Sequence, residues 1–175
     1  MSTTDIRAMQ AGDLDAVKEL HLRNWRDSYA GLIDPDFLGE PVVRDMARRW
    51  AQVPPAPDLA LVAIKEGVLT GFARLRVNHA EGPLLMNLHV DAHHRGTGSG
   101  RALFEACVRH VVEQGLDQLW LEVLSGNEAA RTLYARWGGV ESAPLQDSIS
   151  GTPVKSIRIS WPSVSGLIPT RGEPS

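Results

Sequence analysis

Three glycines at alternate positions separate a strand-like run from a helix-like run, and this junction constrains the fold more than any other feature of the sequence. Residues 84–90 read LLMNLHV, and Gly96, Gly98 and Gly100 follow before apolar residues recur at helical spacing over 101–114. Glycine adopts positive φ without strain and lets a backbone approach a ligand closely. Because the first N–H groups of a helix lack partners and lie at the positive end of its dipole, the junction predicts a cradle for a diphosphate. The alternative is a tight turn in which the glycines only permit close packing.

Two common phosphate-binding motifs do not fit this junction. A Walker A loop needs Gly-Lys-Ser/Thr, and no such string occurs. A dinucleotide fingerprint needs G-x-G-x-x-G, whereas the glycines here are spaced G-x-G-x-G, and Arg101 stands where the third glycine belongs. The spacing therefore disfavours both nucleotide-binding folds.

The periodicity of the remaining chain predicts a mixed α/β domain. We expect strands at 3–9, 59–64, 68–77, 84–90, 118–124 and 154–161, and helices at 13–29, 42–52, 101–114 and 127–137. Residues 65–67 join two of the strands as a hairpin. This alternation, flanked by antiparallel hairpins, is typical of an α/β fold with a mixed sheet. We expect a single domain over 1–162 and a flexible tail over 163–175.

Charge and composition disfavour several kinds of partner. The 175 residues carry 18 basic and 21 acidic side chains, which give a net charge of -3 without the basic surface that nucleic-acid binding requires. No apolar run approaches the ~20 residues needed to cross a bilayer, and the first residues lack a signal-peptide pattern. We therefore expect a cytoplasmic protein without nucleic-acid or membrane partners. The one cysteine, Cys107, lies on an apolar helical stripe and is expected in the core rather than as a nucleophile.

Two linked motifs resemble the GCN5-related N-acetyltransferase (GNAT) family. Arg95-x-x-Gly98-x-Gly100 matches that family's R/Q-x-x-G-x-G/A loop, and LEVLSGNEAARTLYARWGG at 121–139 resembles its second signature. The resemblance implies a GNAT-like mixed, mostly antiparallel central sheet with splayed central strands and flanking helices. Ser99 stands where an aliphatic residue is usual, and Gly139 stands where an aromatic residue often follows, which removes a side chain from the sheet edge.

The resemblance also implies acetyl-CoA as co-substrate, and the residues themselves predict no metal site. The loop amides would bind the CoA diphosphate, and the Leu88 to Val90 backbone would bind the pantetheine arm like an added strand. A β-bulge often causes the splay in family members. The expected cofactor contacts are Leu88, Val90, Arg95, Gly96, Thr97, Gly98, Ser99, Gly100, Arg101 and Asn127. The arginine side chains are alternatively solvated surface cations, and Asn127 is alternatively an N-cap, which is compatible with a pantetheine contact.

Acetyl transfer to an amine needs an acid and a base. By resemblance, Tyr134 is the acid that protonates the leaving thiolate; the alternative is a packed tyrosine with its hydroxyl already hydrogen-bonded. An amine with a pKa near ~10.4 must lose a proton before it attacks. Residues 83–86 hold no glutamate of the kind some family members use, so we expect His89 as the base. Other candidates, acting through water, are His79, Glu81 and Glu122.

The acceptor site is expected against the first helices, as is usual in the family. Residues 20–33 resemble a W-x-x-x-Y/A-G-L pattern in which Trp25 and Tyr29 share one helical face. Together with Asn87 they are the predicted substrate contacts, and packing in the core is the alternative for the two aromatic residues. The adjacent pair His93 and His94 cannot readily chelate one metal ion.

These features predict an N-acetyltransferase that moves an acetyl group from acetyl-CoA to a primary amine of a small molecule or peptide, by direct transfer in a ternary complex. One alternative is a non-catalytic acyl-CoA-binding regulatory module, which would bind CoA without amine-dependent thiol release. A second is a nucleotide-binding domain that excludes acetyl-CoA. Family members are often homodimers, and the resemblance leaves that assembly open.

Overall fold

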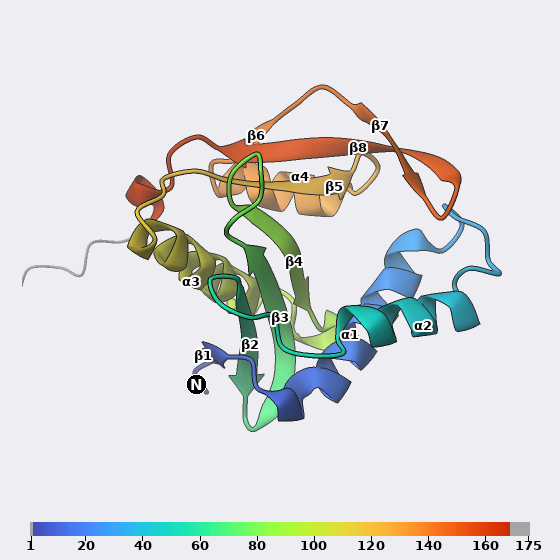
Figure 1. Ribbon diagram of the computed structural model, residues 1–175, viewed down its shortest axis with the longest axis horizontal. Coiled ribbons are helices and arrows are strands. Elements are labelled where there is room, and N and C mark those ends of the chain that lie inside the picture. The colour runs from blue at the N-terminus through green and yellow to red at the C-terminus, as the bar shows by residue number, and fades with distance from the viewer. Residues whose placement is uncertain (1, 169–175) are drawn as a thin grey trace, which may run out of the picture.

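The computed structural model describes residues 2–168, which form an eight-stranded sheet in the order β1-β2-β3-β4-β5-β8-β6, with β7 paired to β8 (Figure 1). The strands are β1 (Asp5–Ala8), β2 (Leu59–Lys65), β3 (Val68–Arg76), β4 (Leu84–Val90), β5 (Leu119–Leu124), β6 (Val140–Glu141), β7 (Leu145–Ile149) and β8 (Thr152–Trp161). Among these strands only β4 and β5 pair in parallel. The expected mixed, mostly antiparallel sheet is confirmed.

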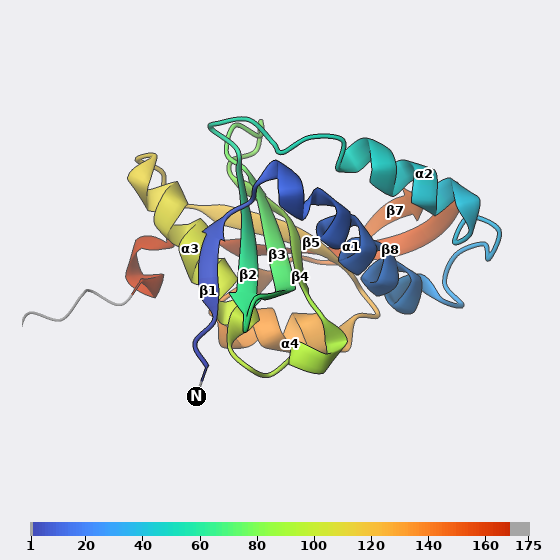
Figure 2. The ribbon, with the colours of Figure 1, turned by 90° about the horizontal axis from the view of Figure 1, so that it is seen from below.

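Four helices cover the two faces of the sheet (Figure 2). Helices α1 (Leu14–Tyr29) and α2 (Glu40–Arg49) pack through one apolar cluster, which includes Trp50 and Phe72. Helices α3 (Ser99–Glu113) and α4 (Glu128–Arg136) pack through a second cluster around Phe104 on the opposite face. The apolar stripes read from the sequence therefore each find a sheet face to bury against.

The sheet opens between its two central strands. Strands β4 and β5 share one paired position, Leu84 with Trp120, and diverge beyond it. The β3–β4 register shifts by one residue between the pairs Leu75–Leu85 and Arg74–Asn87, so Met86 is the extra residue of a bulge in β4. A bulge bends its strand and increases the local twist, which turns the rest of β4 away from β5. Both the expected splay and the expected bulge are present.

Two tight hairpins connect strands of the sheet, and the sequence predicted one of them. The β2–β3 hairpin turns at Glu66 and Gly67, both at positive φ, as expected. A second hairpin, β7–β8, was not predicted, although Ser150 and Gly151 at its turn also have positive φ and form a recognisable turn dipeptide.

The expected tail begins too early in the sequence. Val164 is fully buried, and its N–H donates to the Asp117 backbone carbonyl and to Asp117 Oδ1, each at 3.0 Å. Leu167 and Ile168 pack against the core on the α3 side of the sheet. Residues 163–168 are thus held by burial and hydrogen bonds, so the packed chain extends past the expected boundary at 162. The remainder of the expected tail, 169–175, lies outside the described residues.

Gly139 has a packing role that the sequence comparison did not reveal. A Cβ at this position would lie 2.5 Å from Ile159 Cγ2 and 3.0 Å from the Tyr134 carbonyl oxygen. The glycine therefore lets the end of α4 approach β8 closely, rather than simply removing a side chain from the sheet edge.

We predict that Gly139→Ala lowers the free energy of unfolding by about 1–3 kcal/mol, because the added methyl overpacks a contact that includes backbone. Chemical denaturation measures this change. Gly12→Ala is the matched control, because no atom lies within 4 Å of a Cβ built there. Equal losses in the two variants would contradict the close-approach explanation.

Candidate active site

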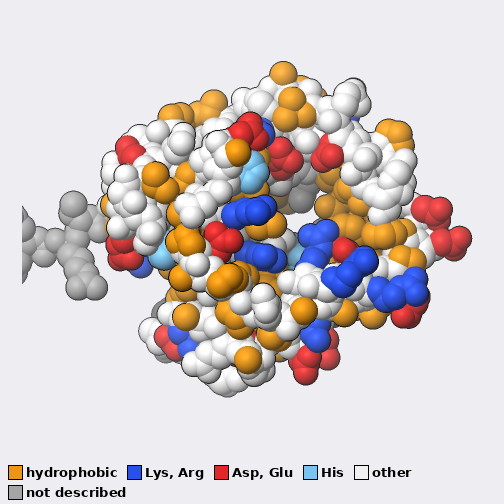
Figure 3. All heavy atoms as spheres, viewed as in Figure 1, with side chains coloured by type: hydrophobic (Ala, Val, Ile, Leu, Met, Phe, Trp, Pro, Cys, Tyr) orange, Lys and Arg blue, Asp and Glu red, His pale blue; other side chains and the backbone are white. Residues whose placement is uncertain are grey.

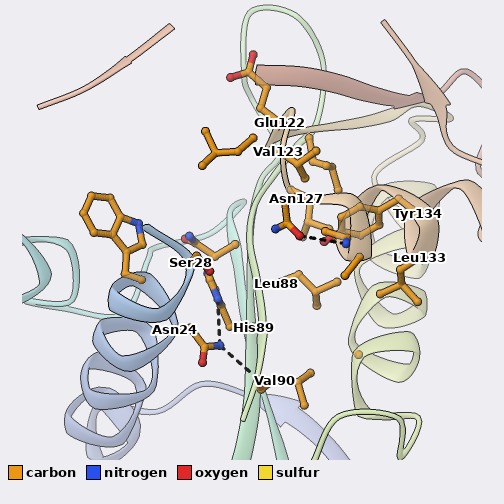
Figure 4. A pocket seen from close by; sticks show the side chains of 18 of the residues that line it. Asn24, Ser28, Leu88, His89, Val90, Glu122, Val123, Asn127, Leu133 and Tyr134 are labelled. Carbon is orange, nitrogen blue, oxygen red and sulfur yellow. Dashed lines mark hydrogen bonds between the residues drawn. The ribbon is translucent and has the colours of Figure 1, made fainter. Parts of the chain in front are cut away.

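A cleft of about 940 Å³ occupies the opening between β4 and β5. Figure 3 shows it as a hollow in one face of the molecule, and Figure 4 shows α1 on one side of β4 and α4 on the other. The cleft brings together most of the residues expected from the sequence: Trp25, Tyr29, Asn87, Leu88, His89, Val90, Arg95, Gly96, Gly98, Gly100, Arg101, Asn127 and Tyr134. Thr97 and Ser99 are not among its lining residues; the buried Ser99 hydroxyl lies 3.3 Å from the hydroxyls of Thr4 and Thr97.

The glycine loop presents unpaired backbone donors at one end of the cleft. Gly98 has a φ of 89° and immediately precedes α3. Within residues 2–168 the N–H groups from Gly98 to Arg101 have no hydrogen-bond acceptor, whereas the next amide, Ala102, donates to the Gly98 carbonyl. These groups lie at the positive end of the α3 dipole. The loop therefore fits a phosphate or diphosphate group, and its donors are not consumed by the turn itself.

The backbone of β4 offers a second set of polar groups to the cleft. The Asp91 N–H, just after β4, donates to the Thr70 carbonyl of β3 at 2.8 Å. This bond shows which residues direct their backbone groups toward β3: Asp91 and, two residues earlier, His89. Because successive strand residues direct their backbone groups to opposite sides, those of Leu88 and Val90 face the open edge toward β5. An extended amide-containing chain could pair with this edge as an added strand does.

Asn127 and Tyr134 project from α4 into the same region (Figure 4). Asn127 is an N-cap, since its side chain accepts from the Ala130 N–H at 3.2 Å. Tyr134 is 7% exposed, and burial raises the pKa of its phenol. The hydroxyl forms no hydrogen bond within the part of the chain that the structure describes. The alternative of a packed tyrosine whose hydroxyl is already hydrogen-bonded therefore does not describe this residue. The phenol stays protonated through the neutral range.

The two loop arginines have different surroundings. Arg101 Nε donates to Glu105 at 2.7 Å, and its guanidinium lies 5.4 Å from the Trp137 ring centroid. Arg95 Nε donates to the Val90 carbonyl at 3.4 Å. Arg101 is thus held along α3 by an ion pair and an aromatic ring, and neither side chain is simply a free surface cation.

The hydrogen bonds of His89 define which of its nitrogens carries the proton. Asn24 Nδ2 lies 3.3 Å from the Val90 carbonyl oxygen and 3.3 Å from His89 Nδ1 (Figure 4). A carbonyl oxygen can only accept, so this atom of Asn24 is the NH₂ nitrogen and it donates to both partners. His89 Nδ1 is then an acceptor, and neutral His89 carries its proton on Nε2.

His89 is also a weak base. Burial lowers its pKa to about 4, with the Arg95 charge as a smaller cause. Its ring stacks on Phe72, and the ring of His21 lies 4.7 Å away, centroid to centroid. Proton transfer to it from an ammonium with a pKa of ~10.4 would be uphill by roughly 9 kcal/mol. The role of His89 as the base stays a prediction. Because Nδ1 is the unprotonated nitrogen of the neutral ring, accepting a proton there would also break the hydrogen bond from Asn24.

A second histidine is fixed in the same way. The Trp50 indole N–H, which can only donate, lies 2.9 Å from Nδ1 of the buried His21. Burial lowers the pKa of His21 to about 2, with the charge of His89 adding to the effect. The two histidines beneath the cleft are therefore neutral, and both carry the proton on Nε2.

The far end of the cleft lies between α1, α2 and β7. Trp25 contacts both Tyr29 and Phe37, with ring centroids 4.4 and 5.6 Å away, and it also lines the cleft. The packing and substrate-facing roles are therefore compatible. Sequence reasoning missed Arg49 and Asp147 as lining residues; they come from α2 and from the unexpected hairpin strand β7, and no motif marks them.

Other expectations concern groups away from the cleft. Cys107 is fully buried, and burial raises the pKa of its thiol to about 12, which confirms it as a core residue rather than a nucleophile. Within residues 2–168 no three His, Cys, Asp or Glu side chains group as they would around a metal ion. None of the helices formed by those residues combines the length and apolar character of a membrane span.

A model of the acetyltransferase (GNAT) family matches residues 14–139, most of the chain. The chain belongs to this family. The match includes α1, the glycine loop and α4, which together enclose the cleft.

Relatives of this GNAT chain differ in what their names say they acetylate. Mycothiol acetyltransferase of Thermobispora bispora is 36% identical over 106 residues, which cover 57% of this chain and 36% of that protein. The [ribosomal protein bS18]-alanine N-acetyltransferase of Escherichia coli is 36% identical over 74 residues, which cover 42% of this chain and 49% of that one. The chain thus aligns with about a third to a half of the length of these curated relatives.

The fold is shared with solved acetyltransferases. PaiA N-acetyltransferase of Thermoplasma acidophilum, crystallised with coenzyme A, superposes with a TM-score of 0.66 at 17% identity, over 91% of this chain and 99% of that one. At this identity the likeness shows the fold.

We predict that the side-chain nitrogens of His21 and His89 show the Nε2–H tautomer in long-range ¹H–¹⁵N spectra at pH 7. Neither should titrate between pH 5 and 8, because their lowered pKa values keep both neutral there. In Asn24→Leu, His89 should lose this tautomer preference while His21 keeps it. A protonated Nδ1 on His89 in the unsubstituted protein would contradict the assignment.

A second prediction tests the loop as a diphosphate site. Gly100→Asp should weaken CoA binding by about a hundredfold or more, because a carboxylate would face the phosphates. Gly100→Ala is the matched control: its Cβ would lie 3.5 Å from Val90 Cγ2, an ordinary contact. Gly98 is less suitable because any side chain there strains a backbone at positive φ. Calorimetry measures the affinities, and equal values for the two variants would locate the phosphates elsewhere.

Proposed function

We propose that this protein transfers an acetyl group from acetyl-CoA to a primary amine by direct transfer in a ternary complex. The observation that carries the proposal is the splay of β4 and β5, which leaves an open strand edge between the free loop amides and the Tyr134 phenol. Acetyl-CoA supplies a thioester, whose acyl carbon is open to attack by an amine and whose sulfur leaves as a thiolate.

Three sets of backbone groups in the chain would bind different parts of this co-substrate. The N–H groups from Gly98 to Arg101 would bind the diphosphate, where the α3 dipole adds to their attraction. The backbone groups of Leu88 would hold the pantetheine arm in extended form along β4, since the Val90 carbonyl already accepts from Asn24 and Arg95. The Val90 N–H, which faces the same edge, would polarise the thioester carbonyl.

Tyr134 is proposed as the acid. Its raised pKa keeps the phenol protonated, and its free hydroxyl can donate a proton to the departing sulfur. The acceptor would enter between Trp25, Tyr29 and Asn87 at the other end of the cleft. Two routes would avoid the uphill proton transfer from the acceptor amine to His89. The enzyme would bind the amine in its neutral form from solution, or the ammonium would pass its proton through water to Glu122.

We expect Tyr134→Phe to lower kcat by about a hundredfold or more, because general acid catalysis of this kind contributes ~10²–10⁴. The dissociation constant for CoA should be unchanged, since the ring and its packing are retained. Thiol release with saturating acetyl-CoA and amine measures kcat, and calorimetry measures CoA affinity. An unchanged kcat would remove the phenol from the mechanism.

The same assay separates catalysis from the non-catalytic alternative. A regulatory acyl-CoA-binding module would bind CoA with no amine-dependent thiol release across amino acids, polyamines, aminoglycosides and peptides. Release that depends on one class of amine supports the enzyme.

A further inference from the structure

Three arginines lie near one another beside the α2 wall of the cleft, and one of them, Arg49, lines it. Arg49, at the end of α2, lines the cleft, and Arg74 and Arg76 project from β3 on the same face of the sheet, two residues apart. Figure 3 shows basic side chains gathered below the hollow, over the region of α2 and β3. The only described ion pair of these three arginines joins Arg49 Nε to Asp45, which leaves the terminal nitrogens of Arg49 for another partner.

Arg74 is the least satisfied of the three. Its side chain is half-buried with the guanidinium 5.6 Å from the Trp50 ring centroid, and its Nε is buried without a hydrogen-bond partner in residues 2–168. Burial lowers its pKa; Asp58 opposes this shift, and the charges of Arg49 and Arg76 add to it. A buried donor on a charged group is costly when it lacks an acceptor. An anion bound at the terminal nitrogens of Arg49 would offset this crowding of like charges.

The opposite wall of the cleft carries two carboxylates, of which Glu122 is paired with Arg158 at 3.5 Å. Glu122 of β5 and Asp147 of β7 both line it. Burial raises the pKa of the Tyr29 phenol, the Arg49 charge lowers it and the Asp147 charge raises it, so both charged groups lie close to this ring. The cleft therefore presents a cationic wall and an anionic wall across the predicted acceptor contacts, which suits a molecule with an ammonium and an anionic group.

We propose that the acceptor is a small amine that also carries an anionic group, and that Arg49 binds that group. This inference rests on the proposed acetyl transfer and narrows its substrate class. Polyamines and aminoglycosides, which are purely cationic, would place a second ammonium rather than an anion against Arg49, and we expect them to be poorer acceptors.

The test uses acceptors that differ in the anionic group alone. The carboxylate arm compares 4-aminobutyrate with 4-aminobutanamide, and alanine with alaninamide, with rates expressed per unprotonated amine. The phosphate arm compares 2-aminoethyl phosphate with ethanolamine. We expect kcat/KM for thiol release to be at least about tenfold higher for the anionic member in one arm, the size of a charge-assisted hydrogen bond. A preference within the carboxylate pairs identifies the anionic group as a carboxylate, and a preference within the phosphate pair identifies it as a phosphate.

Arg49 variants connect the preference to the proposed wall. Arg49→Gln should reduce the preference to about one, and Arg49→Lys should restore part of it because the charge returns without the guanidinium fork. Arg44→Gln is the matched control, since Arg44 lies on the same helix, is exposed and is not a lining residue. Calorimetric CoA affinity should be equal in all of them.

The outcomes separate this inference from the function on which it rests. Amine-dependent release without any preference, or a preference that Arg49→Gln leaves intact, overturns the anion site and leaves the acetyl transfer standing. Faster turnover of spermidine than of every anionic amine does the same. Absence of release with every amine overturns both.

Discussion

The single pairing of β4 with β5, at Leu84 and Trp120, is the constraint on which the rest of the site depends. A continuous sheet would consume the backbone groups of Leu88 and Val90 in hydrogen bonds to β5. The bulge at Met86 bends β4 away instead, so the Leu88 groups and the Val90 N–H remain available at the edge of a cleft. The Val90 carbonyl accepts from Asn24 and Arg95. The glycine loop follows at the end of the same strand, so the splay sets both the open edge and the direction of the free amides.

Burial sets the protonation states around this opening. His21 and His89 are packed against Phe72 and held by single hydrogen bonds at Nδ1, so both are neutral and share one tautomer. Tyr134 is buried on the other face of the sheet and keeps its proton. The centre of the cleft thus carries little charge, while its polar and charged groups are placed at the ends: backbone donors at the loop, and Arg49 facing Asp147 at the far end.

Much of this arrangement could be predicted from the sequence because it depends on local chemistry. Glycine spacing marked the loop, apolar periodicity marked the helices, and Asn127 could be read as an N-cap. The hairpin strand β7 was missed because its residues are mostly exposed and show little apolar alternation. Arg49 and Asp147 were missed for a related reason: an isolated charged residue has the same appearance in a sequence whether it faces water or a cleft.

The sequence by itself determined the order of strand, loop and helix, the family resemblance and the position of the glycine loop, because each follows from the identity and conformational limits of a few neighbouring residues. Only the tertiary structure decided that Asn24 fixes the proton of His89, that Gly139 is required by Ile159, and that Arg74 is left without an acceptor. These facts depend on segments far apart in the chain, and their distances are set by how helices pack on a bent sheet, which no local pattern encodes.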